Sequence, residues 1–106
     1  MKKEKNIIIK TTYANKNKAL HLANLLLENK LSSCVQIKQI ESLYRYEGKL
    51  HKEKEFEINI KTRKKLFKQI KKLIQKNHPY ETPQIIALKI ESMNSSYLRW
   101  HLDSTN

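Results

Sequence analysis

The sequence predicts one α+β domain with the element order βαββαβ and a short helix at its carboxyl end. Three observations support this fold class: an unbroken apolar run near the start, a long segment of period-two alternation in the middle, and segments of helical periodicity on either side of it. At 106 residues the chain falls in the size range where one hydrophobic core is usual. We therefore expect a single domain over residues 1–106.

The first two elements follow from residues 6–30. Ile7-Ile8-Ile9 stand together without polar alternation, which predicts a central strand over residues 6–13 with both faces buried. Apolar residues then recur at helical spacing: Ala19, Leu20, Ala23, Leu26 and Leu27. This spacing predicts an amphipathic helix with Asn15 as its N-cap. We expect it to end at Asn29-Lys30, because asparagine tolerates the left-handed conformation found at helix ends.

The middle of the chain predicts a long β-hairpin. Residues 32–46 alternate with period two over about twice the usual strand length, so this strand is expected to bend or bulge midway. Glu47-Gly48 contains the only glycine of the chain and separates two extended runs, as a tight hairpin turn requires. The return strand is expected over residues 49–62.

The last third of the chain predicts a helix, a strand and a short helix. The second helix starts at Arg63 and carries one apolar stripe, which consists of Leu66, Phe67, Ile70, Leu73 and Ile74. It must end by Asn77, because His78 precedes Pro79 and the residue before a proline is pushed out of the helical region. We expect the last strand over residues 84–90 and the terminal helix over residues 95–102.

This order suits a four-stranded antiparallel sheet with both main helices on one face. The other face would then expose tyrosine and isoleucine side chains of two overlong strands. Exposed strand edges of that length invite pairing with another chain. We therefore expect closed symmetric association of several copies.

Composition narrows the class of protein further. The formal net charge of +12 is compatible with a polyanion as partner. However, 19 of the 22 basic residues are lysine, and the chain is also rich in Asn and Ile. Codons for these three residues are favoured in an AT-rich genome, so codon drift explains the positive charge better than selection for a polyanion. The amino-terminal residues offer neither a secretory signal nor a membrane span, and the single Cys34 agrees with a reducing compartment. We expect a cytoplasmic protein that has no contact with membranes.

Candidate chemistry is limited, and each feature also has a structural explanation. His78 and Glu81 could share a metal or a proton, whereas the two prolines around them more simply define a rigid connection. Cys34 could bind a soft metal, but a cysteine among apolar strand residues is more often a small buried side chain. The four histidines lack the short spacings of a zinc site.

Aromatic and charged residues give two further candidates. Tyr44, Tyr46, Tyr97 and Trp100 could line a pocket or stack on bases, or could anchor a core or an interface. Glu55 and Lys61 could face a cleft between subunits, or form a surface ion pair. Because the chain contains only one glycine, it cannot form a glycine-rich phosphate-binding loop. The sequence also lacks the signature of an activated nucleophile and that of paired catalytic carboxylates. We expect no enzymatic activity.

Four segments carry a family resemblance in their order and spacing: residues 31–37 (LSSCVQI), 42–50 (SLYRYEGKL), 78–85 (HPYETPQI) and 97–100 (YLRW). They resemble the CutA family of divalent-cation tolerance proteins over nearly the whole chain. The resemblance implies a ferredoxin-like domain and a tight homotrimer built through the long hairpin strands. It also implies a part in tolerance of copper and other divalent ions.

The resemblance further implies site residues. His78 and Glu55 are the expected ligands of divalent copper, and Lys61, Tyr80, Tyr44 and Trp100 are the expected lining of a ligand cleft between subunits. Two departures weaken the copper site: Lys10 stands where bacterial members can carry Cys, and Asn77 where a second His can precede the His-Pro-Tyr motif. Tyr46, Gln84 and Met93 also depart from the usual pattern.

Two alternatives remain from other classes of protein. RNA-recognition domains share the βαββαβ order, so a basic RNA-binding module is one alternative. The aromatic signature of those domains is missing, because the third strand carries Glu55-Phe56-Glu57-Ile58, whose acidic pair would repel phosphate. We therefore do not expect nucleic acid as a partner. The other alternative is a protein scaffold with no metal role.

Overall fold

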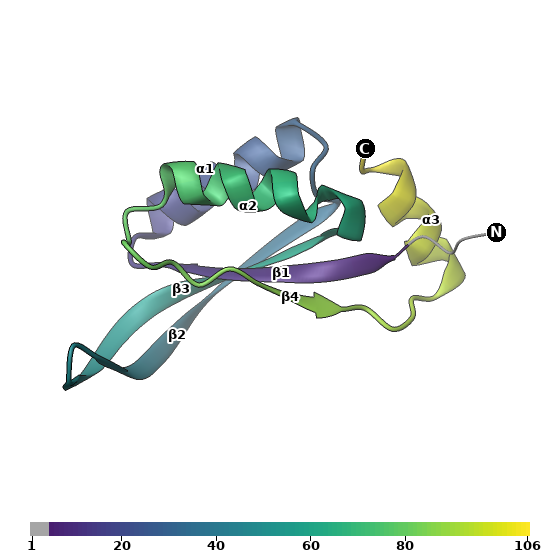
Figure 1. The fold of residues 1–106 in the computed structure, drawn as a ribbon. Helices are drawn as coiled ribbons and strands as arrows, with labels where there is room; N and C mark the ends of the chain where they lie inside the picture. Colours follow the sequence, from purple (N-terminus) through teal and green to yellow (C-terminus); the bar gives the residue numbers. More distant parts are fainter. Residues whose placement is uncertain (1–4) are drawn as a thin grey trace.

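The computed structural model describes residues 5–106 and shows a four-stranded antiparallel sheet with α1 and α2 on one face (Figure 1). The elements are β1 (Asn6–Tyr13), α1 (Lys16–Glu28), β2 (Cys34–Tyr46), β3 (Lys49–Arg63), the 3-10 helix η1 (Lys64–Leu66), α2 (Phe67–Asn77), β4 (Ile86–Lys89) and α3 (Ser95–Asp103). The strand order β2-β3-β1-β4 places β1 inside the sheet. The predicted fold class, α+β with βαββαβ order and a short terminal helix, is confirmed.

The first helix begins as the sequence predicts. Asn15 is extended, with φ of −115°, and its Oδ1 accepts a hydrogen bond of 3.1 Å from the Lys18 amide, which is the N-cap arrangement. Its end differs from the prediction, because the left-handed residue is Lys30, with φ of 55°, and not Asn29. The Asn29 backbone amide and side-chain amide both donate to Leu25 O, which holds Asn29 on the helix.

The hairpin has nearly the expected bounds but no bulge. Pairing of β2 with β3 runs without interruption from Cys34 opposite Lys61 to Tyr46 opposite Lys49, so the predicted bulge is wrong. Glu47 and Gly48 both have positive φ, 50° and 75°, which matches a two-residue turn whose twist suits the flanking strands. The hairpin extends past the helix layer and gives the chain its longest dimension of 49 Å (Figure 1).

The last strand is shorter than the predicted 84–90. Its pairing with β1 ends where Ile86 lies opposite Lys10. Further along β1, the Thr12 carbonyl accepts a hydrogen bond of 2.7 Å from the His78 ring instead of from a strand. The segment between α2 and β4 is therefore held by side-chain contacts, and residues 84–85 do not join the sheet.

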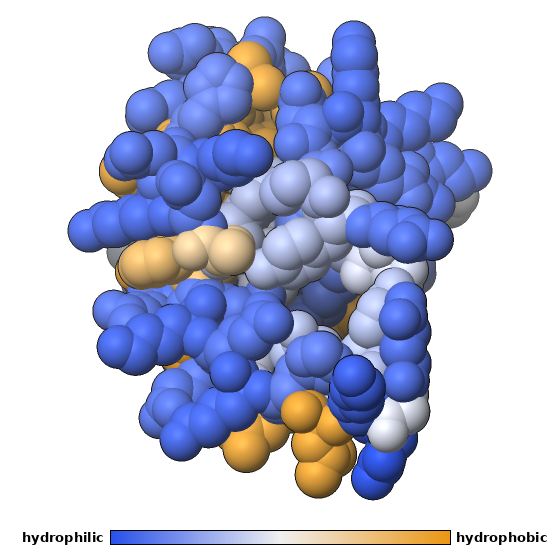
Figure 2. Space-filling model, turned by 90° about the vertical axis from the view of Figure 1, so that its left-hand side faces the viewer, coloured by the Kyte–Doolittle hydropathy of each residue, from blue (hydrophilic) through white to orange (hydrophobic). Residues whose placement is uncertain are grey.

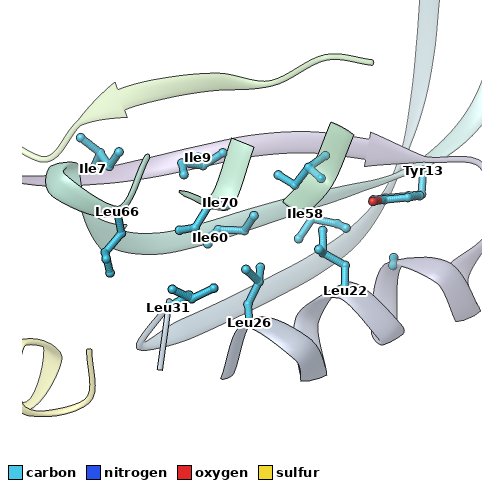
Figure 3. Close-up of a cluster of buried hydrophobic side chains, with 12 residues drawn as sticks. Ile7, Ile9, Tyr13, Leu22, Leu26, Leu31, Ile58, Ile60, Leu66 and Ile70 are labelled. Atoms are coloured by element: carbon cyan, nitrogen blue, oxygen red, sulfur yellow. The ribbon is translucent and has the colours of Figure 1, made fainter. Parts of the chain in front are cut away.

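The hydrophobic core lies between the sheet and the two main helices (Figure 3). Its buried members are Ile7, Ile9, Tyr13, Ala19, Leu22, Leu26, Leu31, Ile58, Ile60, Leu66, Ile70 and Ile74. The second helix ends at Asn77, and the next residue, His78, is extended with ψ of 133°, as predicted from Pro79. Along the part of the chain that the structure describes, no helix combines the length and apolar character needed to cross a membrane.

A buried polar cluster attaches α3 to the rest of the domain. His101 is fully buried; its Nδ1 contacts Ser33 Oγ and its Nε2 lies 3.0 Å from Asn6 Oδ1. The Arg63 guanidinium donates to Leu102 O and to Thr105. Buried polar groups of this kind are stable because each finds a partner. The cluster therefore connects the beginning, the middle and the end of the chain.

Candidate functional site

The candidate site lies on the open face, which is the face of the sheet turned away from α1 and α2. Side chains of a strand point alternately to its two faces, so β3 directs Ile58 and Ile60 into the core and Glu55 toward the open face. Glu55 is nevertheless only 6% exposed. The segment after α2 covers it, because the Tyr80 hydroxyl donates a hydrogen bond of 2.9 Å to Glu55 Oε2. Burial raises the pKa of Tyr80, and the neighbouring Glu55 raises it further.

His78 lies beside this pair and is held by contacts at both ring nitrogens. Its Nε2 lies 2.7 Å from the Thr12 carbonyl, which can only accept, so Nε2 carries the proton. Its Nδ1 accepts from the Tyr80 amide at 3.1 Å, and the ring stacks on Tyr13 with centroids 4.2 Å apart. Burial lowers the pKa of His78. The imidazole is thus neutral, and neither nitrogen has a lone pair free for a metal in this arrangement.

A cleft opens next to Glu55, with a volume of about 750 Å³. Its lining residues include four glutamates, Glu41, Glu53, Glu55 and Glu81, together with Tyr44, Tyr46 and Tyr80. Glu41 follows Ile40, the residue opposite Glu55, so its side chain points to the other face of the sheet, where it pairs with Lys52 at 3.3 Å. No lysine or arginine is among its lining residues, although the chain carries a net charge of +12. We call it the carboxylate cleft. Figure 2 views the hairpin end of the molecule and shows a hollow bordered by side chains of intermediate hydropathy within a mostly hydrophilic surface.

The charge of the cleft acts on its tyrosines. Glu81 and Glu47 raise the pKa of Tyr46, and partial burial together with Glu53 raises the pKa of Tyr44. Both phenols therefore stay protonated at neutral pH and can donate or accept hydrogen bonds. Carboxylate and phenol oxygens around one hollow favour a cationic ligand, since an anion would be repelled.

Two predicted residues lie elsewhere on the open face. Lys61 is six positions beyond Glu55 on β3, which is about 20 Å along a strand. Its Nζ donates to the Tyr97 hydroxyl at 3.2 Å and lies 5.2 Å from the centre of that ring, and Trp100 packs on Tyr97. Within one chain the structure thus brings together Glu55, Tyr80, His78 and Tyr44, but not Lys61 and Trp100.

Two glutamates of the cleft, Glu41 and Glu53, were absent from the sequence prediction, and Glu81 was considered only as a possible partner of His78. Glu53 could have been found from alternation, because it shares a face with Glu55 two positions away. The place of Glu41 and Glu81 beside the cleft could not, since it depends on the strand register and on the course of the chain after α2. Lys10, at the position where bacterial family members can carry Cys, forms an ion pair of 3.5 Å with Glu57.

Comparison with known proteins gives the family. The model of the CutA1 divalent ion tolerance protein family matches residues 7–104. The chain belongs to the CutA family. It is 32% identical over 99 residues to the divalent-cation tolerance protein CutA of Pyrococcus horikoshii, covering 93% of this chain and 97% of that one. It is 35% identical over 98 residues to the Thermotoga maritima protein of the same name, covering 92% and 97%.

Solved structures of the family agree with the fold. CutA1 from Oryza sativa superposes with a TM-score of 0.92 at 36% identity, covering 97% of this chain and 95% of that one. The protein from Archaeoglobus fulgidus, described as a periplasmic divalent cation tolerance protein, gives 0.90 at 33% identity, covering 93% and 97%. The chain is therefore a CutA-family divalent-cation tolerance protein with the fold of that family.

Proposed function

We propose that this CutA-family chain works without catalysis, as a homotrimer that binds a divalent cation or a small cationic ligand in the carboxylate cleft. The observation that supports this most is the concentration of three glutamates, Glu53, Glu55 and Glu81, and three tyrosines around one hollow in a chain that is otherwise strongly basic. Binding a cation there neutralises carboxylates that repel one another.

Association of several copies is supported by the surface next to the cleft. Leu43 and Leu50, near the hairpin turn, are 73% and 76% exposed, and Leu43 also lines the cleft. Figure 2 shows apolar side chains at the lower edge of the hairpin end. The outer strands β2 and β4 leave their outer edges open in one chain. A neighbouring subunit that covered these leucines would also border the cleft, so the complete site would contain residues of two subunits.

Copper fits the residues of one chain poorly. Among the side chains around the cleft, the imidazole of His78 is the type of ligand that suits copper best. Both of its nitrogens already form hydrogen bonds, one with the Thr12 carbonyl and one with the Tyr80 amide. Among the described residues no group of three or more His, Cys, Asp or Glu side chains is placed to hold a metal ion. The oxygen atoms of the cleft are the ligand type of a hard divalent ion, but such an ion would also need ligands from a second subunit, because the described residues of one chain provide no group of three for it either. A copper site would therefore need ligands from a second subunit or movement of His78.

The experiment is calorimetric titration of copper, zinc, magnesium and calcium ions into metal-free protein, with molecular mass in solution measured on the same sample. We expect a mass of three chains and cation binding that is lost in Glu55→Gln. That variant removes the charge but keeps an acceptor for Tyr80. His78→Ala is the comparison. Binding of copper alone that is lost in His78→Ala and kept in Glu55→Gln would contradict the carboxylate cleft as the site.

We further propose that the protein acts in the cytoplasm. The one cysteine, Cys34, is a free thiol in a half-buried position, which agrees with a reducing compartment. Relatives differ in this respect, since plant members are named chloroplastic and the Archaeoglobus protein is described as periplasmic. Fractionation of cells that express the chain, followed by immunodetection, tests the proposal, and recovery outside the cytoplasmic fraction would contradict it.

A further inference from the structure

A second hollow lies on the helix side of the molecule, away from the carboxylate cleft, with a volume of about 910 Å³. It lies where the first turns of α2, the start of β1 and the strand β4 meet. Its rim carries five lysines: Lys5, Lys64, Lys65, Lys68 and Lys89. Its floor is apolar and consists of Ile7, Phe67 and Ala87. We call it the basic groove.

Three of the five rim lysines, Lys64, Lys65 and Lys68, lie in one segment without acidic neighbours, whereas Lys5 follows Glu4 in the sequence and Lys89 Nζ lies 3.6 Å from Glu91 Oε2. Eight basic residues and no acidic residue occur between Lys61 and Lys76, whereas four of the ten acidic residues of the chain line the carboxylate cleft. Drift toward lysine codons explains an excess of lysine, but it does not explain this separation of charge. In the described part of the chain, no lysine of η1 or α2 forms an ion pair.

The arrangement is also unfavourable for the helix itself. Lys64, Lys68 and Lys72 follow one another at four-residue spacing, where like charges repel. The first turn of α2 contains no acidic residue, and no side chain caps its amino end, so the positive end of the helix dipole meets further positive charge. An anion in the basic groove would relieve both effects.

We infer that the basic groove binds single-stranded nucleic acid through its phosphodiester backbone, without reading sequence. A rim of lysines around an apolar floor with an aromatic ring is the combination that such binding uses, since lysines contact phosphates and an aromatic ring or apolar floor accepts the face of a base. Phe67 supplies the ring; it is partly buried against the core and Lys71 Nζ lies over it, 5.8 Å from its centre, so a base would stack on it only after Lys71 moves aside to a phosphate. The acidic open face plays no part in this binding.

An anionic membrane suits the groove less well. A basic helix binds a membrane surface by burying its apolar side among the lipids. In α2 that side is already used, because Ile70 and Ile74 are buried in the core, both at 0% exposure. Only the lysines are available, and they are arranged around a concave surface. A flexible strand of phosphates can enter a groove, whereas a membrane surface cannot.

The test is fluorescence anisotropy with a labelled single-stranded DNA of mixed sequence, 15 nucleotides long, across a series of salt concentrations. If all five lysines contact phosphates, the slope of log affinity against log salt is about −3.5, and affinity falls about 100-fold between 50 and 200 mM salt. The triple variant Lys64→Gln/Lys65→Gln/Lys68→Gln should lose about two units of that slope. Its circular dichroism spectrum and thermal midpoint show whether it is folded.

A matched control removes the same charge elsewhere. Lys16, Lys18 and Lys49 are exposed and lie outside the groove, so the variant with all three changed to Gln has the same net charge as the groove variant. It should keep most of the affinity and of the slope. Equal loss in both variants would overturn the inference in favour of net charge alone. Absence of binding to DNA at 50 mM salt, or binding only to vesicles that contain anionic lipid, would overturn it as well.

Discussion

Removal of one hydroxyl group tests how the segment after α2 is fixed to the sheet. Tyr80→Phe keeps the ring beside His78 but takes away the donor to Glu55, whose side chain is only 6% exposed. A hydrogen bond to a charged group contributes about 1.5–3 kcal/mol, and a buried carboxylate that loses its partner keeps its cost of desolvation. Because Tyr80 is itself half-exposed, we expect a loss at the lower end, about 1.5 kcal/mol.

The assay is urea unfolding followed by circular dichroism at one fixed protein concentration, since association would make stability depend on concentration. The same substitution in a Glu55→Gln background completes a double-mutant cycle. There Tyr80→Phe should cost less, about 0.5–1.5 kcal/mol, because a neutral acceptor replaces the carboxylate. A loss below about 0.5 kcal/mol in the native background, or an equal loss in both, would refute the importance of this bond.

Four further expectations follow from the described contacts. Burial lowers the pKa of His78, so the unfolded chain binds a proton more readily at this residue than the folded chain does. The free energy of unfolding should therefore fall as the pH drops below the ordinary pKa of histidine. Thermal melts between pH 7.5 and 5 measure this dependence, and His78→Gln should make it weaker. Lys68→Glu replaces a repelled charge at the positive end of α2 and should raise the free energy of unfolding by about 0.5–1 kcal/mol in the same melts; a decrease would argue against the charge repulsion. Ile70→Ala leaves a cavity at a residue with 0% exposure and should lower that free energy by about 2–5 kcal/mol in urea titration. If the chain forms the proposed trimer, Leu43→Asp combined with Leu50→Asp should reduce the mass measured by light scattering from three chains to one, and an unchanged trimer mass would show that these leucines lie outside the subunit interface.

The elements that the sequence predicted well are those determined by local chemistry. Asn15 caps α1 because its side chain reaches an amide three residues away, and the turn forms at Glu47-Gly48 because glycine takes positive φ without steric cost, although Glu47 also has a positive φ of 50°. The end of α2 follows from Pro79. In each case neighbouring residues decide the structure, and no distant contact is needed.

The features that escaped prediction depend on distant contacts. The last strand stops early because His78, eight positions before Ile86, donates to the carbonyl that pairing along β1 would otherwise use. The carboxylate cleft requires β2 in register with β3 and Tyr80 folded back over Glu55. Its ligand positions were therefore predicted only in part, and Lys61, predicted for the same cleft, lies at the other end of the open face.

The buried contacts of His101 have a consequence for how the molecule opens. One imidazole bridges Asn6 near the start of the chain and Ser33 ahead of β2, and the last residue, Asn106, donates to Lys30 O. A terminal helix usually frays independently of the core. Here α3 cannot detach without releasing the first residue of β1, so in hydrogen exchange both ends of the chain should open as one cooperative unit. A substitution in α3 should therefore also change the hydrogen-exchange protection of the start of β1, and a substitution at Asn6 should change that of α3.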